Sequence, residues 1–294
     1  MPFWQLTLPA SADCADGLTN FLWEQGALGV VEEEAPDVPP RLRAFFAESV
    51  SSTRLLATVQ DYQASLRSLG FAIESHGTEI TPLLDEAWAS AWQQSFPARE
   101  VGRRLLVLPP WIEPPARADA VPRLTVIIEP GRAFGTGHHG STEGCLVLLE
   151  EALAALPGSA TLDIGTGTGI LAIAALKLGA PTVLAIDVDP DAVSATQVNA
   201  GRNGSSGLTV RLAEPREVAD RFPLVLANLL THTHLALAPQ YARLVAPGGS
   251  LVLGGMLQDE DGRVSEALAG AGLATRSRLV LEDWASLRLE APPA

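Results

Sequence analysis

Cysteine is scarce in this chain, whose 294 residues include only Cys14 and Cys145. Two cysteines this far apart provide neither a disulfide framework nor the spacing of a metal cluster. Long apolar runs are also missing, and no basic stretch precedes an apolar one in residues 1–10, which argues against a membrane span and a secretory signal. These absences predict a globular cytoplasmic protein that binds no membrane and no metal.

Positive charge is in short supply as well. Lysine and arginine number 20 against 34 aspartates and glutamates, which gives a formal net charge of −14. A broad contact with nucleic acid depends on neutralising phosphates, so direct nucleic-acid binding is not expected. The acidity favours a basic partner, while the alternative that it only maintains solubility stays open at this point.

The first hundred residues divide into a small domain and a connecting helix. Residues 1–79 show strand and helix patterns in the order β-α-β-β-α-β, with the fourth strand over Phe71–Glu74, and this order predicts a ferredoxin-like α+β domain. Residues 80–98 are expected to form a linker, built on a helix over Leu83–Phe96 that has two tryptophans one turn apart.

Residues 99–294 alternate between strand and helix patterns. The last two strands are expected near Leu279–Leu281 and Ala285–Leu289. Alternation of this kind predicts an α/β fold with a doubly wound, Rossmann-like sheet.

The most informative stretch runs from Thr161 to Asp187. An apolar strand is followed by three alternate glycines (Gly165, Gly167 and Gly169), then by an apolar helix and a second strand that ends in Asp187. Glycines let the backbone approach a ligand where a Cβ would collide, and a helix N-terminus supplies unpaired N–H groups. An acid about 20 residues further on is placed to accept hydrogen bonds from ribose hydroxyls. The stretch therefore predicts a site for a nucleoside-containing cofactor.

Two cofactor classes fit these glycines. Read from Gly167, the pattern Gly-x-Gly-x-x-Ala also suits a dinucleotide such as NAD. Three features favour S-adenosyl-L-methionine. The carboxylate of Asp163 can offset an ammonium group and would repel a pyrophosphate. Asn228 places a polar side chain at the carboxyl edge of the sheet, where ligands bind, and the Pro247-Gly248-Gly249 turn has a layout common in class I methyltransferases.

The segment 129–142 contains the most specific motif. Glu129-Pro130-Gly131 and Phe134-Gly135-Thr136-Gly137 are followed by His139 and Thr142. With this motif, the chain resembles over nearly its whole length the ribosomal protein methyltransferase family that modifies large-subunit ribosomal protein eleven. The resemblance implies a class I methyltransferase domain behind a recognition domain, and methylation of lysine side-chain amines and the N-terminal amine of that basic protein.

The resemblance also implies site residues. Thr142 would lie near the methionine end of the cofactor, Gly165 would bring the backbone close, Asp187 would hold the ribose hydroxyls and Asn228 would line the methyl-transfer face. Asn228 is thus the catalytic candidate, and the complete cofactor-binding set is Thr142, Asp163, Gly165, Gly167, Gly169, Asp187 and Asn228. The chain departs from many members at 138–142, where it has His-His-Gly-Ser-Thr for Thr-His-Pro-Thr-Thr, and at 229–234, which lacks a glycine-containing turn.

Four histidines have open roles. His138 and His139 could shape the cofactor loop or be hydrogen-bonded structure. His232 and His234 could share one side of an extended segment, but no further ligand has suitable spacing, so no metal is predicted. The rival functions are a small-molecule methyltransferase and a non-catalytic cofactor-binding protein of ribosome assembly. A monomer is expected.

Overall fold

The computed structural model describes residues 3–35, 38–47, 49–68, 70–71, 73, 77–83, 96–114, 123–130, 135 and 139–293. The chain divides into two compact units, Met1–Phe96 and Pro97–Ala294. Among the helices of these described residues, none is both long and apolar enough to cross a membrane.

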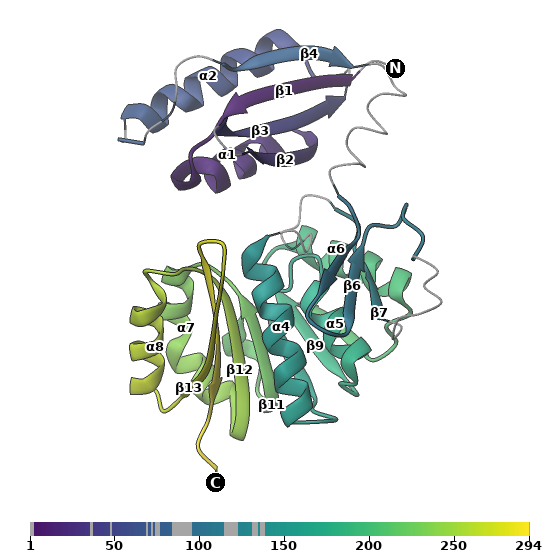
Figure 1. Cartoon of the computed structure of the whole chain (residues 1–294), viewed down its shortest axis with the longest axis vertical. Helices are drawn as coiled ribbons and strands as arrows, with labels where there is room; N and C mark the ends of the chain where they lie inside the picture. Colours follow the sequence, from purple (N-terminus) through teal and green to yellow (C-terminus); the bar gives the residue numbers. More distant parts are fainter. Residues whose placement is uncertain are drawn as a thin grey trace. The chain divides into compact units, whose positions relative to one another are not determined.

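The first unit is an antiparallel sheet with two helices packed on it (Figure 1). Its strands lie in the order β2-β3-β1-β4. One apolar core joins Leu6 and Leu8 of the sheet to Leu18 of the first helix and Val59 of the second. The order β-α-β-β-α-β is the expected one, and the ferredoxin-like assignment stays a prediction. The elements are β1 (Phe3–Pro9), α1 (Ala12–Glu24), β2 (Ala27–Ala35), β3 (Val38–Ala47), α2 (Ser52–Ser68) and β4 (Glu79–Leu83).

Strand β4 lies later in the chain than the sequence predicts. The expected strand over Phe71–Glu74 is wrong, because the described residues Phe71 and Ile73 are in no strand, whereas Glu79–Leu83 pairs with β1. Ile73 lies in the connection between α2 and β4, and its side chain is buried in the core of the first unit. Burial of this side chain explains the apolar pattern at a place where the backbone pairs with no strand. The first unit therefore continues beyond residue 79. Of the predicted linker helix, Leu83 belongs to β4, and residues 84–95 lie outside the described part.

The second unit is built on a seven-stranded sheet with the order β10-β9-β8-β11-β12-β14-β13. Six strands run in the same direction, and β14, between β12 and β13, runs antiparallel to both of its neighbours. The order reverses between β8 and β11, and ligands of doubly wound folds bind at the carboxyl ends of such strands. The strands are β8 (Thr161–Ile164), β9 (Val183–Asp187), β10 (Leu208–Leu212), β11 (Phe222–Asn228), β12 (Val245–Leu257), β13 (Ala274–Leu281) and β14 (Trp284–Glu290).

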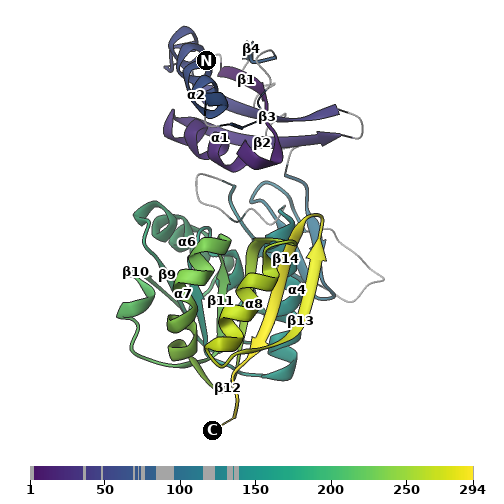
Figure 2. The same ribbon diagram turned by 90° about the vertical axis from the view of Figure 1, so that its left-hand side faces the viewer.

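Helices cover both faces of this sheet, which confirms the doubly wound prediction (Figure 2). Helices α4 and α5 pack in one core, and α7 and α8 in the other. Helix α5 is apolar on nearly every side because it is buried on nearly every side. The helices are α4 (Gly140–Ala155), α5 (Ile170–Leu178), α6 (Pro190–Asn203), α7 (Thr231–Leu244) and α8 (Asp261–Gly270).

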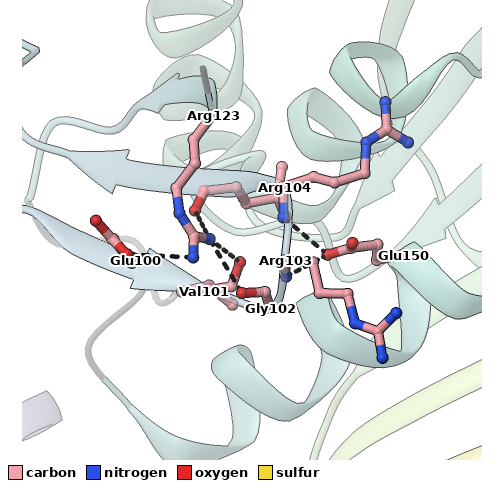
Figure 3. Close-up of polar contacts among 8 residues, drawn as sticks. Glu100, Val101, Gly102, Arg103, Arg104, Arg123 and Glu150 are labelled. Atoms are coloured by element: carbon pink, nitrogen blue, oxygen red, sulfur yellow. Dashed lines mark hydrogen bonds and ion pairs between the residues drawn. The ribbon is translucent and has the colours of Figure 1, made fainter. Parts of the chain in front are cut away.

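A second, three-stranded sheet comprises β5 (Arg99–Val101), β6 (Leu105–Leu108) and β7 (Leu124–Ile127). Arg123 organises the β5–β6 turn, as Figure 3 shows. Its Nη2 pairs with Glu100 Oε2 at 3.1 Å. Its Nη1 donates to three backbone carbonyls of the turn, those of Val101, Gly102 and Leu105 at 3.3, 3.0 and 3.1 Å.

The same turn is fastened to helix α4. Glu150 Oε2 accepts hydrogen bonds from the backbone N–H groups of Arg103 at 3.0 Å and Arg104 at 3.3 Å, while both arginine side chains point outward (Figure 3). Two turns earlier on α4, Glu143 pairs with Arg99 at 2.8 Å. Residues seven apart share one face of a helix, so the hairpin lies along one face of α4.

Candidate active site

The turn after β8 consists of glycines in a conformation that other residues rarely adopt. Gly165, Gly167 and Gly169 have φ angles of 70°, 56° and 83°, and Gly169 caps the N-terminus of α5. A Cβ on Gly165 would lie only 2.5 Å from Cδ2 of Leu229. The missing side chain thus makes room for the end of β11 and keeps the turn narrow. The first N–H groups of α5 are left at the carboxyl edge of the sheet.

Asp163, at the end of β8, is fully buried. Its Oδ2 accepts a hydrogen bond of 2.7 Å from the Thr166 hydroxyl, whereas its Oδ1 has no partner among the described residues. Burial raises the pKa of the Asp163 carboxyl to about 7, and the nearby Asp187 carboxylate adds to that rise. Hydrogen bonding by the Thr166 hydroxyl and by the backbone N–H of Ala172 opposes it. The site therefore holds a carboxyl that would gain from a cationic neighbour.

Asp187 ends β9, and its carboxylate is hydrogen-bonded to the glycine turn that follows β8. Its Oδ2 accepts from the backbone N–H of Gly167 at 3.0 Å, and its Oδ1 from that of Asp189 at 3.0 Å. A carboxylate has about four acceptor positions. Two backbone bonds orient Asp187 and leave acceptor capacity toward the edge of the sheet.

Thr142 and Asn228, which are 86 residues apart in the chain, meet at this edge. Asn228 ends β11, and its Nδ2 donates to Oγ1 of the buried Thr142, in the first turn of α4, at 3.1 Å. In this orientation of the amide, the Nδ2 end faces the Thr142 hydroxyl. Asn228 Oδ1 therefore faces away from Thr142 as an acceptor, and no described residue donates to it.

A β-bulge in β12 lies against Asn228. Leu253 pairs with Leu287 and Met256 with Ala285, so Gly254 and Gly255 together oppose one residue of β14. A Cβ on Gly254 or on Gly255 would lie 3.1 or 3.0 Å from Asn228 Oδ1. The bulge thus builds a wall of bare backbone beside the amide, and bulges of this kind are frequent next to active sites.

The described part of the segment 129–142 packs against the glycine turn. The Thr168 hydroxyl donates to the Gly135 carbonyl at 2.6 Å, and Asn199 Oδ1 accepts from the Glu129 N–H at 3.0 Å. Residues 131–134 and 136–138, including His138, lie outside the described residues. The two sequence motifs, 33 residues apart at this contact, therefore belong to one site.

Comparison with known proteins decides what kind of site this is. Residues 2–292 match the family model described as ribosomal protein L11 methyltransferase (PrmA). The chain belongs to this family. It is 33% identical over 299 residues to the ribosomal protein L11 methyltransferase of Pelobacter propionicus, with 96% of both chains covered. It is 37% identical over 285 residues to that of Azotobacter vinelandii, with 92% of this chain and 93% of the relative covered.

A solved structure of similar fold is the ribosomal protein L11 methylase of Lactobacillus delbrueckii subsp. bulgaricus. It has a TM-score of 0.60 and 29% identity, and the match covers 66% of this chain and 98% of the other. Membership in the PrmA family confirms the predictions of a methyltransferase and of S-adenosyl-L-methionine as its cofactor. The dinucleotide alternative is thereby set aside.

The side chains present suit this cofactor. Two buried acceptor atoms, Asp163 Oδ1 and Asn228 Oδ1, have no donor in the described part of the chain, and a buried acceptor normally has a partner. Asp163 is the penultimate residue of β8, Asn228 ends the neighbouring strand β11, and Asp187 ends β9 on the other side of β8. The seven candidate residues thus come together at one edge of the sheet. Their individual roles in a PrmA protein remain predictions.

Of the described histidines, His139 has one of the two roles considered for it, and His232 and His234 differ from the expectation. His139 is the N-cap of α4, where its Nδ1 lies 2.7 Å from the Ser141 hydroxyl and its ring packs against Trp284. His232 and His234 lie in helix α7 and not in an extended segment, with His232 exposed and His234 fully buried. Within the described residues, no group of three or more potential ligands could hold a metal ion.

Sequence reasoning missed the residues that support the site. The β12 bulge and the buried pair His234 and Tyr241 carry no motif of their own. A signal for the bulge was available in the doublet Gly254-Gly255 inside an apolar strand, because glycine in a strand often marks a bulge or a close backbone approach.

Proposed function

We propose that this chain transfers methyl groups from S-adenosyl-L-methionine to lysine side-chain amines and the N-terminal amine of ribosomal protein L11. The relatives that it matches over nearly their whole length are named ribosomal protein L11 methyltransferase. The observation that carries the proposal is the Asn228–Thr142 hydrogen bond, which leaves Asn228 Oδ1 as a fixed acceptor at the carboxyl edge. An amine N–H is the natural donor to such an oxygen.

In this proposal four side chains hold the cofactor. Asp187 binds the ribose hydroxyls through its remaining acceptor positions, because Gly167 and Asp189 use only two of them. Asp163 offsets the ammonium of the methionine part, and Thr142 and Asn228 line the methyl-transfer face. When bound, the cofactor supplies a methyl group on a positively charged sulfur that is already activated for transfer.

The protein must then present a neutral amine. A lysine ammonium has an ordinary pKa of about 10.4, and a dry surrounding lowers it because burial disfavours the charged form. The amine held at Asn228 Oδ1 uses its lone pair to form the new C–N bond, while the C–S bond breaks and one proton leaves to solvent. We assign no general base among the described residues.

The edge of the sheet beyond Asn228 suits a basic segment. Leu257, at the end of β12, is 39% exposed. The β12–α8 connection contributes the exposed Asp259, and the β13–β14 turn contributes the exposed Glu282 and Asp283. The backbone N–H of Gln258 donates to the Asp283 carbonyl at 2.9 Å, so the two loops adjoin. Acidic side chains around an apolar one complement a lysine-bearing chain.

The same proposal assigns the division of labour. The second unit contains all seven candidate site residues, so the first unit is assigned recognition of the protein substrate. We also assign the chain to the cytoplasm, acting as a monomer without direct nucleic-acid binding, in keeping with its net charge of −14.

The test is incubation of the purified chain with labelled S-adenosyl-L-methionine and unmethylated ribosomal protein L11, with sites located by mass spectrometry. We expect label on lysines and on the N-terminus of that protein, and a loss of at least tenfold in rate for Asn228→Ala. Thr209→Ala, on the exposed edge strand β10, is the control and should keep the wild-type rate. Label that enters only small molecules would overturn the assigned substrate.

A further inference from the structure

The buried histidine of helix α7 is engaged at both ring nitrogens. His234 Nε2 lies 2.8 Å from the carbonyl oxygen of Gly254, and its Nδ1 lies 2.9 Å from the hydroxyl of Tyr241, which is also fully buried. A carbonyl can only accept, so Nε2 carries the proton and Nδ1 accepts from the tyrosine hydroxyl. The partners therefore select one neutral tautomer.

The Gly254 carbonyl is the point at which the β12 bulge joins the end of β11. It accepts a second hydrogen bond of 3.0 Å from the backbone N–H of Leu229, the residue directly after Asn228. Gly254 is also the register partner of Asn228 between the two strands. The orientation of this one peptide group thus fixes both the position of Leu229 and the wall beside Asn228 Oδ1.

Apart from the Leu229 N–H on the β11 side, few groups hold that peptide in place. Toward β14 the bulge lacks a regular ladder partner, and Gly255, on the other side of the peptide, has a φ of 83° that glycine adopts freely. A Cβ on Gly255 would lie 2.5 Å from the Leu229 carbonyl oxygen, so no side chain can lock the turn from within. The imidazole N–H supplies the missing constraint from helix α7.

We propose that His234 is a positioning residue for methyl transfer, which holds the Gly254 peptide so that Asn228 Oδ1 points at the incoming amine. This inference rests on the proposed role of Asn228. His234 itself reaches neither cofactor nor amine in this account, since it is buried and both ring nitrogens are occupied. Burial lowers its pKa to about 4, against the opposing effect of the Gly254 and Leu229 carbonyls, so the neutral tautomer persists at physiological pH.

The experiment compares four variants of the full chain. His234→Met has an apolar side chain of similar size without a hydrogen-bond donor. His234→Gln keeps an N–H that can reach the Gly254 carbonyl. Tyr241→Phe removes the hydroxyl that selects the tautomer of His234. His232→Gln, on the exposed side of the same helix, is the matched control. A misplacement of about 1 Å can cost on the order of 100-fold in rate.

We expect His234→Met to lower kcat for methylation of ribosomal protein L11 by 10- to 100-fold, with cofactor affinity and protein KM changed less than threefold. His234→Gln should have a kcat close to that of the wild type, and Tyr241→Phe should lower kcat less than His234→Met does. The kcat of His232→Gln should equal that of the wild type. In hydrogen exchange, the backbone amide of Leu229 should exchange faster in His234→Met than in the wild type, while the amides of β11 keep their protection. A residue that only stabilised the fold would instead change all these quantities together.

Two outcomes would overturn the inference. One is an unchanged kcat in a folded His234→Met, and the other is a folded His234→Gln that fails to recover activity. If His234→Met does not fold, the inference is tested by the kcat of Tyr241→Phe and of His234→Gln. A Tyr241→Phe variant with the wild-type kcat, or a folded His234→Gln without activity, would then contradict it. If the wild type leaves ribosomal protein L11 unmethylated, the proposed substrate is wrong, and the side-chain amide NMR signal of Asn228 then decides alone. A signal displaced in His234→Met but not in His232→Gln supports the inference, and an unchanged signal contradicts it.

Discussion

The buried carboxyl of Asp163 makes a quantitative prediction about pH. Its pKa is about 7 in the folded chain, against an ordinary value of about 3.9 when unfolded. Between these values the folded state binds the extra proton, so the contribution of Asp163 to the stability of the cofactor-free protein falls as pH rises from about 4 to 7 and is level above that. The whole fall is about 4 kcal/mol, with a limiting slope of about 1.4 kcal/mol per pH unit.

Asp163→Asn is the perturbation that isolates this effect. The amide oxygen can still accept the hydrogen bond from Thr166, and no charge can form. Its NH₂ replaces an oxygen without a described partner, which costs about 1–3 kcal/mol. We therefore expect the variant to be less stable than the wild type at pH 4, equally or more stable at pH 8, and free of the fall between them.

The assay is urea unfolding from pH 4 to 8, with Asp220→Asn, an exposed carboxylate, as the control that retains the slope. Cofactor binding supplies a second reading. An ammonium beside Asp163 favours the carboxylate, so binding near pH 6 should release a proton in the wild type and none from this site in Asp163→Asn. Parallel stability profiles for the wild type and Asp163→Asn would refute the reasoning.

Four further outcomes are expected. Asp187→Ala should weaken cofactor binding by about 2–4 kcal/mol through the loss of charge-assisted hydrogen bonds, and calorimetry showing an affinity equal to that of Asp220→Asn would contradict this. Gly254→Ala, whose Cβ would lie 2.5 Å from Cys145 Sγ, should destabilise the chain by about 1–3 kcal/mol in urea unfolding, so an unchanged midpoint would count against the packing described. Single-turnover methylation should accelerate with pH toward the lysine pKa without a falling limb below about pH 9, whereas a bell-shaped profile would reveal a missed acid or base. Residues 97–294 alone should fold and bind cofactor in calorimetry yet methylate ribosomal protein L11 poorly, and full activity of this fragment would disprove the division of labour.

Local patterns were enough to predict the part of the site that is local in sequence. The strand, glycine turn, helix and second strand from Thr161 to Asp187 follow one another, so each backbone requirement is written into adjacent residues. The last two strands, β13 and β14, were predicted for the same reason, although their antiparallel pairing was not. Contacts across the sheet were beyond this reasoning. The resemblance brought Thr142 and Asn228 into one site, but their hydrogen bond depends on how α4 packs on β11 and β12.

The two errors have different origins. An apolar run at 71–74 looked like a strand because burial alone gives that pattern, whereas pairing with β1 falls on Glu79–Leu83, so the deciding partner is distant in sequence. The extended segment considered for His232 and His234 rested on too few residues to show the helical period of α7, which is local information.

The two fastenings along α4 have a mechanical consequence. The chain enters the second unit at residue 97 and is tied at once to Glu143 and then to Glu150. Tension applied to the chain at that point is therefore shared over two turns of a helix and does not act on a single bond. Thr142, the residue before Glu143, lies at the first of these attachment points, so the entry of the chain into the second unit is joined directly to the helix turn that positions Asn228.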